Sequence, residues 1–254
     1  MSSSFIFVLF AFPVLLAILV IALVVRHRRR RTPASTSTTL VVTRFVAIAY
    51  AALTLVFTVI SVVATLISEA VEVSIPVTRF WPEPYPWITI EQGPSASVTD
   101  GGFFLAEVTA VGLGTDARLL LAAGHALQGL TLTVIAVTVA LLCHRLLDGM
   151  PFRPVLSRTV NVAAVAIAVG GLLWQVCFWI GGSIASAQVL SVTGWTSDDP
   201  RAQDPSFDFA TGLPEPTFAM TIDFWPLFLG LALAAVAAAF RYGERLQRDT
   251  EGLV

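Results

Sequence analysis

Three polar side chains interrupt long apolar stretches of this sequence, and they are the first candidates for chemistry. His125 and Gln128 are three positions apart and would share a helix face, while Gln175 lies in a later apolar stretch. Polar groups are costly in hydrocarbon, so such residues often mark proton or ligand pathways. One interpretation is a proton- or ligand-binding pair, His125 and Gln128, that faces Gln175. The other is interhelical hydrogen bonding that sets helix packing, and the lack of a carboxylate in these stretches favours it.

Sequence patterns of common catalytic and metal sites are missing. His27, His125 and His144 are scattered, and there is no HExxH or CxxC motif. The serines of the expected external loops have no histidine beside them, so a serine hydrolase would lack its base. Cys143 and Cys177 fall in expected helices, where they predict packing roles rather than a disulfide. The sequence therefore predicts a protein that is not an enzyme, needs no cofactor or metal, and makes no direct contact with nucleic acid.

Composition and one basic cluster predict a membrane protein and its orientation. Of 254 residues, 56% are hydrophobic and only 13% are charged, against about 25% in a soluble domain. Arg26, Arg28, Arg29, Arg30 and Arg31 lie between two apolar runs that are each long enough to cross a bilayer. Basic residues beside a spanning helix stay on the cytoplasmic side. The N-terminus is therefore expected outside and the C-terminus inside, with twelve of the 15 arginines on the inner side.

The fold class expected from these runs is an all-α integral membrane protein, a bundle of five transmembrane helices. Residues 1–25 form an N-terminal anchor helix, 26–39 a basic cytoplasmic linker, and 40–254 a membrane domain of four helices. External loops cover 68–117 and 189–223, and a cytoplasmic tail covers 243–254. The four helices of the membrane domain are expected at Leu40–Ile67, Arg118–Leu142, Arg158–Gln188 and Phe224–Tyr242.

The external loops are expected to form a small β-rich subdomain. Alternation of apolar and polar residues, typical of strands, occurs at Val71–Val77, Trp87–Glu91 and Phe104–Val111. The two ends of the second loop, 189–195 and 220–224, are expected to add strands to the same sheet. Asp100-Gly101-Gly102 predicts a turn between two of the strands.

Small residues four positions apart favour close helix contacts. The pairs Gly181 and Ala185, and Gly182 and Ser186, lie on the fourth expected helix of the chain, and Gly230, Ala234 and Ala238 lie on the fifth. Such faces pack helices within a bundle, and they also leave open a homo-oligomer.

Two cytoplasmic stretches resemble a known family. The tail from Phe240 to Val254 and the turn Asp148-Gly149-Met150-Pro151-Phe152 are similar to the C-terminal signature and the Gly-x-Pro-Phe turn of a bacterial membrane family, domain of unknown function 2975. Arg153 to Leu156 departs from the family pattern. The resemblance, which covers Leu40 to Val254, implies a multi-spanning protein of unestablished activity, with a helix-turn-helix regulator as a cytoplasmic partner. The expected contact residues are Pro151, Phe152, Gly243, Leu246, Asp249 and Val254.

The function expected from these features is that of a non-enzymatic sensor or regulatory partner in the bacterial cytoplasmic membrane. Its external sheet would receive a signal, and its inner turn and tail would contact a cytosolic protein. The alternative is a small transporter or channel subunit that uses His125, Gln128 and Gln175. An external or intramembrane hydrolase has no visible nucleophile–base pair to support it.

Overall fold

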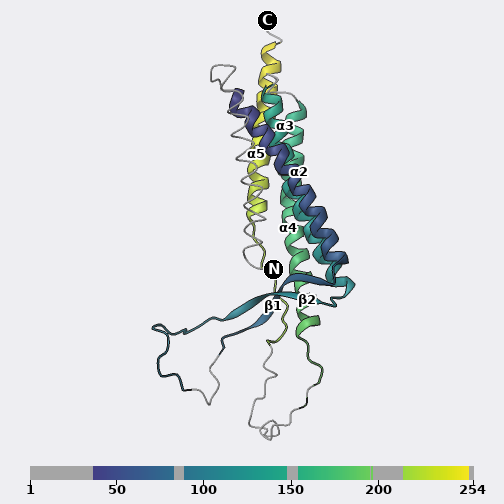
Figure 1. The fold of residues 1–254 in the computed structure, drawn as a ribbon. Helices are drawn as coiled ribbons and strands as arrows, with labels where there is room; N and C mark the ends of the chain where they lie inside the picture. The colour runs from purple at the N-terminus through teal and green to yellow at the C-terminus, as the bar shows by residue number, and fades with distance from the viewer. Residues whose placement is uncertain (1–36, 83–88, 148–153, 195, 197–213, 252–254) are drawn as a thin grey trace, which may run out of the picture. The chain divides into compact units, whose positions relative to one another are not determined.

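A computed structural model describes residues 37–82, 89–147, 154–194, 196 and 214–251. In these ranges there are four long helices and one two-stranded sheet (Figure 1). The helices are α2 (Ser37–Ile67), α3 (Thr115–Leu147), α4 (Pro154–Leu190) and α5 (Trp225–Glu251), and the strands are β1 (Ala70–Phe80) and β2 (Phe103–Val111). The expected anchor helix 1–25, Arg26 to Arg31, Pro151, Phe152 and Val254 lie outside the described residues.

All four described helices are long and apolar enough to cross a membrane, which is consistent with a multi-pass membrane protein. α3 has 33 residues and α4 has 37, so at 1.5 Å per residue they are about 50 and 55 Å long. Both lengths exceed a hydrocarbon core of about 30 Å. The ends of these helices therefore have to extend into the interfacial layers or into water.

The helices begin and end at somewhat different residues from those expected. α2 begins inside the expected linker, α3 begins three residues before Arg118, and α4 begins four residues before Arg158. α5 continues to Glu251, eight residues beyond the apolar span Trp225–Gly243. The expected tail is therefore helical over most of its length, a feature that its apolar pattern alone does not predict.

The chain divides into two compact units. The helical unit contains described residues of 1–63, 123–175 and 222–254. The hairpin unit contains described residues of 64–122 and 176–221, which include the sheet and short segments of α2, α3 and α4.

In the helical unit, consecutive helices run antiparallel and approach each other at glycines. A Cβ built at Gly129 of α3 would overlap Thr58 of α2, and one at Gly170 of α4 would lie 2.5 Å from Oγ1 of Thr131 in α3. A Cβ at Gly230 of α5 would lie 2.8 Å from the carbonyl oxygen of Ala164 in α4. Helices in lipid gain little from the hydrophobic effect, so close backbone approach at small residues is a main source of their packing energy.

In the hairpin unit, β1 and β2 pair in antiparallel fashion. The pairing is regular from Ala70 opposite Val111 to Pro76 opposite Leu105, and after an irregularity Phe80 pairs with Phe103. Side chains alternate as expected along β1: Val71, Val73 and Ile75 are buried, while the positions between them are exposed. The buried side chains form a core with residues at the start of α3 and the end of α4, which are Ala117, Leu121 and Ala185. The strand predictions at 71–77 and 104–111 are confirmed.

The other strand predictions are wrong for the residues described. Residues 89–91, 191–194 and 220–224 form no strand, and residues 189 and 190 belong to α4. Where the structure describes the second loop, its pairing with the sheet is one isolated bridge between Val77 and Pro216, beside a 2.8 Å hydrogen bond from the Thr78 amide to the Glu215 carbonyl. Proline has no amide hydrogen to continue a ladder, so pairing does not propagate from this bridge.

Candidate functional site

Gln175 connects α4 with the segment that leads into α5. Its Nε2 donates to the carbonyl oxygens of Gly171, at 2.8 Å, and of Asp223, at 3.0 Å. Its Oε1 accepts from the Asp223 amide at 2.7 Å. Both amide hydrogens are thus used, and the side chain is buried. This geometry fits the interhelical interpretation of Gln175, because little hydrogen-bonding capacity remains for a ligand.

The start of α5 is packed against the same part of α4. Pro226 is fully buried, and a Cβ built at Gly171 would overlap its ring. Proline is well suited to the first turn of a helix, where its missing amide hydrogen has no intrahelical partner to lose. Gly171, Gln175, Asp223 and Pro226 therefore form one joint between α4 and α5.

His125 and Gln128 are both half-buried on α3, three positions apart as expected. The hydrogen-bonding partners of Gln175 are backbone groups of α4 and of the α5 entry rather than the side chain of either residue. Within the ranges that the structure describes, no group of three His, Cys, Asp or Glu side chains could hold a metal ion.

The hairpin is fixed to α4 through a small-residue face. A Cβ at Gly182 would lie 2.6 Å from the carbonyl oxygen of Ser74, and Oγ of Ser186 donates to the carbonyl oxygen of Pro76 at 2.5 Å. Pro76 and Ser186 are both fully buried. The i, i+4 pair predicted to pack against a helix therefore packs against the backbone of a strand. Its neighbour Gly181 does contact a helix, since its Cβ would lie 3.1 Å from Leu121 of α3.

Arg118 fixes the end of α2 to the start of α3. Its guanidinium donates to the carbonyl oxygens of Ser68 at 2.6 Å, Glu69 at 3.1 Å and Thr65 at 3.4 Å, while Nε donates to Leu113 at 3.0 Å. The last carbonyls of a helix have no intrahelical partner, and a cation satisfies them well. The sequence predicts that Arg118 lies on the outer side of the membrane but gives no sign that it binds backbone about 50 residues away.

Gln188 of α4 forms hydrogen bonds to two residues at the start of α3. Its Oε1 accepts from the Gly114 amide at 2.8 Å, and its Nε2 donates to Oδ1 of Asp116 at 3.1 Å. Together with Arg118 and Ser186, it joins the segments of α2, α3, α4 and β1 that make up the hairpin unit. These three polar residues were not among the predicted sites, because each reaches a backbone group far away in the sequence.

An exposed aromatic cluster lies at the end of the hairpin where Phe80 pairs with Phe103. The opposite end, where Ala70 pairs with Val111, is the one next to α2 and α3 in the chain. The rings of Trp81 and Phe103 stack with centroids 5.4 Å apart and an interplanar angle of 2°, and the Phe80 ring lies 6.0 Å from Phe103. Trp81 and Phe103 are each about half exposed, at 50% and 51%. Exposed apolar groups of this size commonly mark an interaction surface. This cluster is the best candidate for a binding surface among the described residues of the hairpin unit.

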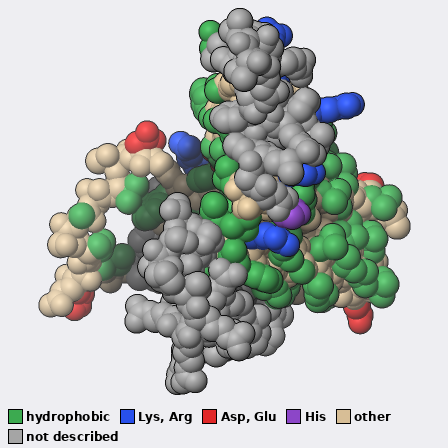
Figure 2. All heavy atoms as spheres, turned by 90° about the horizontal axis from the view of Figure 1, so that it is seen from above, with side chains coloured by type: hydrophobic (Ala, Val, Ile, Leu, Met, Phe, Trp, Pro, Cys, Tyr) green, Lys and Arg blue, Asp and Glu red, His purple; other side chains and the backbone are tan. Residues whose placement is uncertain are grey.

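Arginines gather at one end of the helical unit, near the starts of α2 and α4 and the ends of α3 and α5. Figure 1 shows that α2 begins and α5 ends at the same end of this unit. Nη1 of Arg44 in α2 lies 3.5 Å from Nδ1 of His144 in α3. Figure 2 shows arginine side chains in blue and a histidine in purple among apolar side chains when the molecule is viewed from above. The helical unit therefore has one arginine-rich end, whose described members are Arg44, Arg145, Arg158, Arg241 and Arg245.

Comparisons with protein-family models, with curated proteins and with solved structures found no match to this chain. The resemblance of the tail and the inner turn to domain of unknown function 2975 therefore stays a prediction from sequence. Of the six expected contact residues, Gly243, Leu246 and Asp249 belong to the helical backbone of α5.

Proposed function

We propose that the protein is a non-enzymatic membrane sensor or regulatory partner, with the hairpin outside the cell and the arginine-rich helix ends in the cytoplasm. The observation that carries this proposal is the attachment of the hairpin. Its exposed aromatic cluster is available for contact. Arg118 and Gln188 bind the backbone beside the other end of the hairpin, and Ser186 of α4 holds β1 at Pro76. A ligand held at the cluster would act on β1, which is hydrogen-bonded to α4 through Ser186 and packs against Ala117 and Leu121 of α3.

In this proposal the continuous helix α4 carries the signal across the membrane. α4 is one uninterrupted helix from Pro154 to Leu190, and it carries both Ser186, which holds the hairpin, and Arg158, at its opposite end. A shift of a continuous helix at one end has to be accommodated at the other, because its backbone hydrogen bonds resist compression. Signals received outside would thus reach the inner turn that contains Pro151 and Phe152.

In the cytoplasm, the inner turn and the end of α5 would pass the signal to a partner protein. α5 continues as a helix to Glu251, past the residues apolar enough to lie in the membrane. We propose that this extension, with Gly243, Leu246 and Asp249, contacts a cytosolic protein, and the resemblance given above suggests a helix-turn-helix regulator. As part of the same proposal, the protein lies in a bacterial cytoplasmic membrane with its N-terminus outside.

Two experiments test this proposal. The first places a reporter after Val254 and a short tag beside Gln92; an inside reporter and an outside tag are expected, and the reverse would overturn the orientation.

The second experiment compares cytosolic proteins that co-purify with three versions of the chain: the full chain, a chain that ends at Gly243, and a chain with residues 244–254 in shuffled order. The shuffled chain keeps length and charge. Partner recovery should fall in both altered chains, and unchanged recovery would contradict a role for the tail.

The transporter alternative receives no support from the polar site. The amide hydrogens of Gln175 are both committed to backbone carbonyls, and this leaves His125 and Gln128 without their expected third member. Flux measurements in proteoliposomes with the wild-type chain and with His125→Ala address it directly. Solute movement that depends on His125 would revive this alternative.

A further inference from the structure

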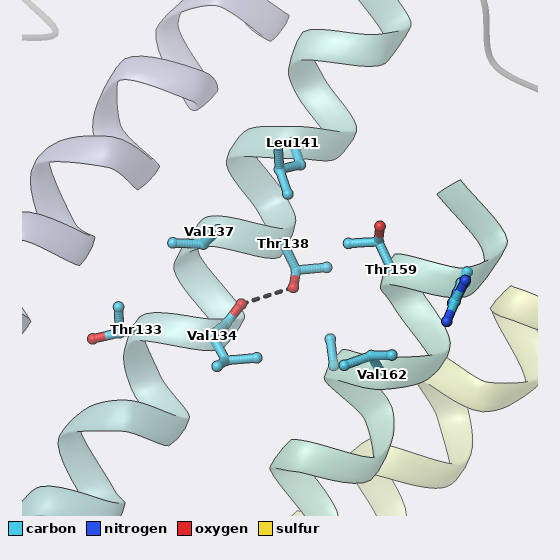
Figure 3. Close-up of a pocket in the computed structure, with 9 residues that line it drawn as sticks. Thr133, Val134, Val137, Thr138, Leu141, Thr159 and Val162 are labelled. Carbon is cyan, nitrogen blue, oxygen red and sulfur yellow. Dashed lines mark hydrogen bonds between the residues drawn. The ribbon is translucent and has the colours of Figure 1, made fainter. Parts of the chain in front are cut away.

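A groove of about 390 Å³ lies between α3 and α4 in the helical unit. Figure 3 shows Thr138 and Leu141 of α3 on one side of the groove and Thr159 and Val162 of α4 on the other. The lining extends over residues 133–141 of α3, a length of about 12 Å at 1.5 Å per residue. That length is comparable with the hydrocarbon depth of one leaflet, about 15 Å.

The walls of the groove are apolar in character even where their residues carry hydroxyls. Oγ1 of Thr138 donates to the carbonyl oxygen of Val134 at 2.7 Å, so the hydroxyl is satisfied within its own helix (Figure 3). Val162 is 60% exposed, and Val137 and Leu141 are exposed as well. In a helix that crosses a membrane, exposed side chains of this kind face lipid rather than water, so the natural occupant of the groove is a hydrocarbon chain.

A single cation accompanies this apolar lining. Arg158 lines the groove, lies near the start of α4 and is exposed. Among the residues that the structure describes, it has no hydrogen-bonded or ion-paired acceptor. It also belongs to the arginine-rich end of the unit. A guanidinium pairs well with phosphate oxygens, and basic pockets between spanning helices on the cytoplasmic side bind anionic lipid head groups.

We propose that the α3–α4 groove binds one molecule of an anionic phospholipid. An acyl chain lies against Leu141 and Val162, and the head-group phosphate pairs with Arg158. The acyl chain accounts for the apolar walls, and the phosphate accounts for a cation that has no acceptor among the described residues. A free anion lacks the chain, and in a zwitterionic phospholipid the ammonium group offsets the charge of the phosphate. This proposal goes beyond the sensor function, and either one stands if the other fails.

Native mass spectrometry of the full chain, released from nanodiscs of equal phosphatidylglycerol and phosphatidylcholine, tests the site. We expect the wild-type chain to retain one phosphatidylglycerol selectively. Arg158→Gln should reduce that selectivity about fivefold, since one arginine near a membrane surface contributes about 1 kcal/mol. The matched control is Arg241→Gln, which removes an exposed arginine at the same end of the unit but outside the groove. Its retention should equal that of the wild type.

Two further measurements separate the parts of the proposal. Val162→Trp fills the groove from an exposed position and should lower the retention of both lipids, whereas equal retention would contradict the acyl-chain contact. Added glycerol phosphate should not displace the bound lipid; if it does so at millimolar concentration, the site binds a soluble anion and the proposal fails. Equal losses in Arg158→Gln and Arg241→Gln would likewise overturn it, because they would indicate general surface charge. Unchanged thermal midpoints in detergent establish that each variant is folded.

Discussion

Ser186 of α4 donates a 2.5 Å hydrogen bond to the carbonyl oxygen of Pro76 in β1, and both residues are fully buried. One turn earlier on the same face, Gly182 lets the carbonyl of Ser74 approach the helix. A strand backbone thus lies directly on a helix that is long enough to cross a membrane. Attachment through backbone carbonyls is stiff, because it does not depend on the rotamers of strand side chains.

Replacement of Ser186 by alanine should loosen the hairpin. The Pro76 carbonyl would be left buried without a donor, at a cost of about 1–3 kcal/mol. In a chain with Cys143 and Cys177 replaced by alanine, a cysteine introduced at the buried position Val73 reports hairpin opening through its rate of maleimide labelling. We expect the rate to rise about fivefold or more.

The control for this experiment is Ser183→Ala. The Ser183 hydroxyl donates only within its own helix, to the carbonyl oxygen of Trp179 at 2.8 Å. Labelling at position 73 should therefore stay near the parent rate. Equal acceleration by both substitutions would show that the Pro76 bond does not hold the hairpin.

Arg118→Gln should lower the thermal midpoint in detergent. The substitution removes the cation that satisfies the carbonyls of Thr65, Ser68 and Glu69, and each hydrogen bond to a charged group contributes about 1.5–3 kcal/mol. Arg118→Lys should recover little, because one ammonium group cannot reproduce the fork of a guanidinium. Arg79→Gln, at an exposed arginine on β1, is the control and should change the midpoint little. Full rescue by lysine would mean that charge alone, and not bond geometry, is required.

Gln175→Leu should destabilise the joint between α4 and α5 without any effect on solute flux. The substitution leaves both backbone groups of Asp223 without their partner, and the expected loss is only about 1 kcal/mol because Asp223 is exposed. Gln128→Leu, on the half-buried face of α3, is the matched control in the same thermal-shift measurement. A normal midpoint together with altered flux in proteoliposomes would favour the transporter alternative.

The sequence predicts the parts of the fold that depend on local pattern. The four described spans follow from runs of apolar residues, and β1 follows from the alternation of Val71, Val73 and Ile75 with polar residues. Helix ends are harder, because they depend on distant partners. α3 begins at Thr115, where Gln188 accepts the preceding amide from 74 residues away. No pattern within residues 110–120 contains that information.

The same limit explains the strands that were wrongly predicted. Residues 220–224 alternate like a strand, but a strand also needs a partner edge. Among the described residues of the second loop, the one that pairs with the sheet is Pro216, which cannot donate, so the pairing there does not extend beyond one bridge. For the polar site, the sequence identifies Gln175 as unusual in an apolar helix. Its partner is the backbone of Asp223, and backbone groups carry no sequence signal.

Gly129 and Thr58 offer a direct test of the contact between α2 and α3. Gly129→Ala should destabilise the protein by about 1–3 kcal/mol, because the new methyl group overlaps the Thr58 side chain and close-packed helices accommodate it poorly. Thr58→Gly removes that side chain and should cost about 0.3–0.5 kcal/mol in helix propensity, because threonine is already a poor helix former. The double variant should be at least about 1 kcal/mol more stable than the sum of the single changes predicts. Thr58→Gly combined with Gly170→Ala is the matched comparison, because Gly170 contacts Thr131 and these two effects should add. Strict additivity in both pairs, measured from unfolding midpoints in detergent, would contradict the contact.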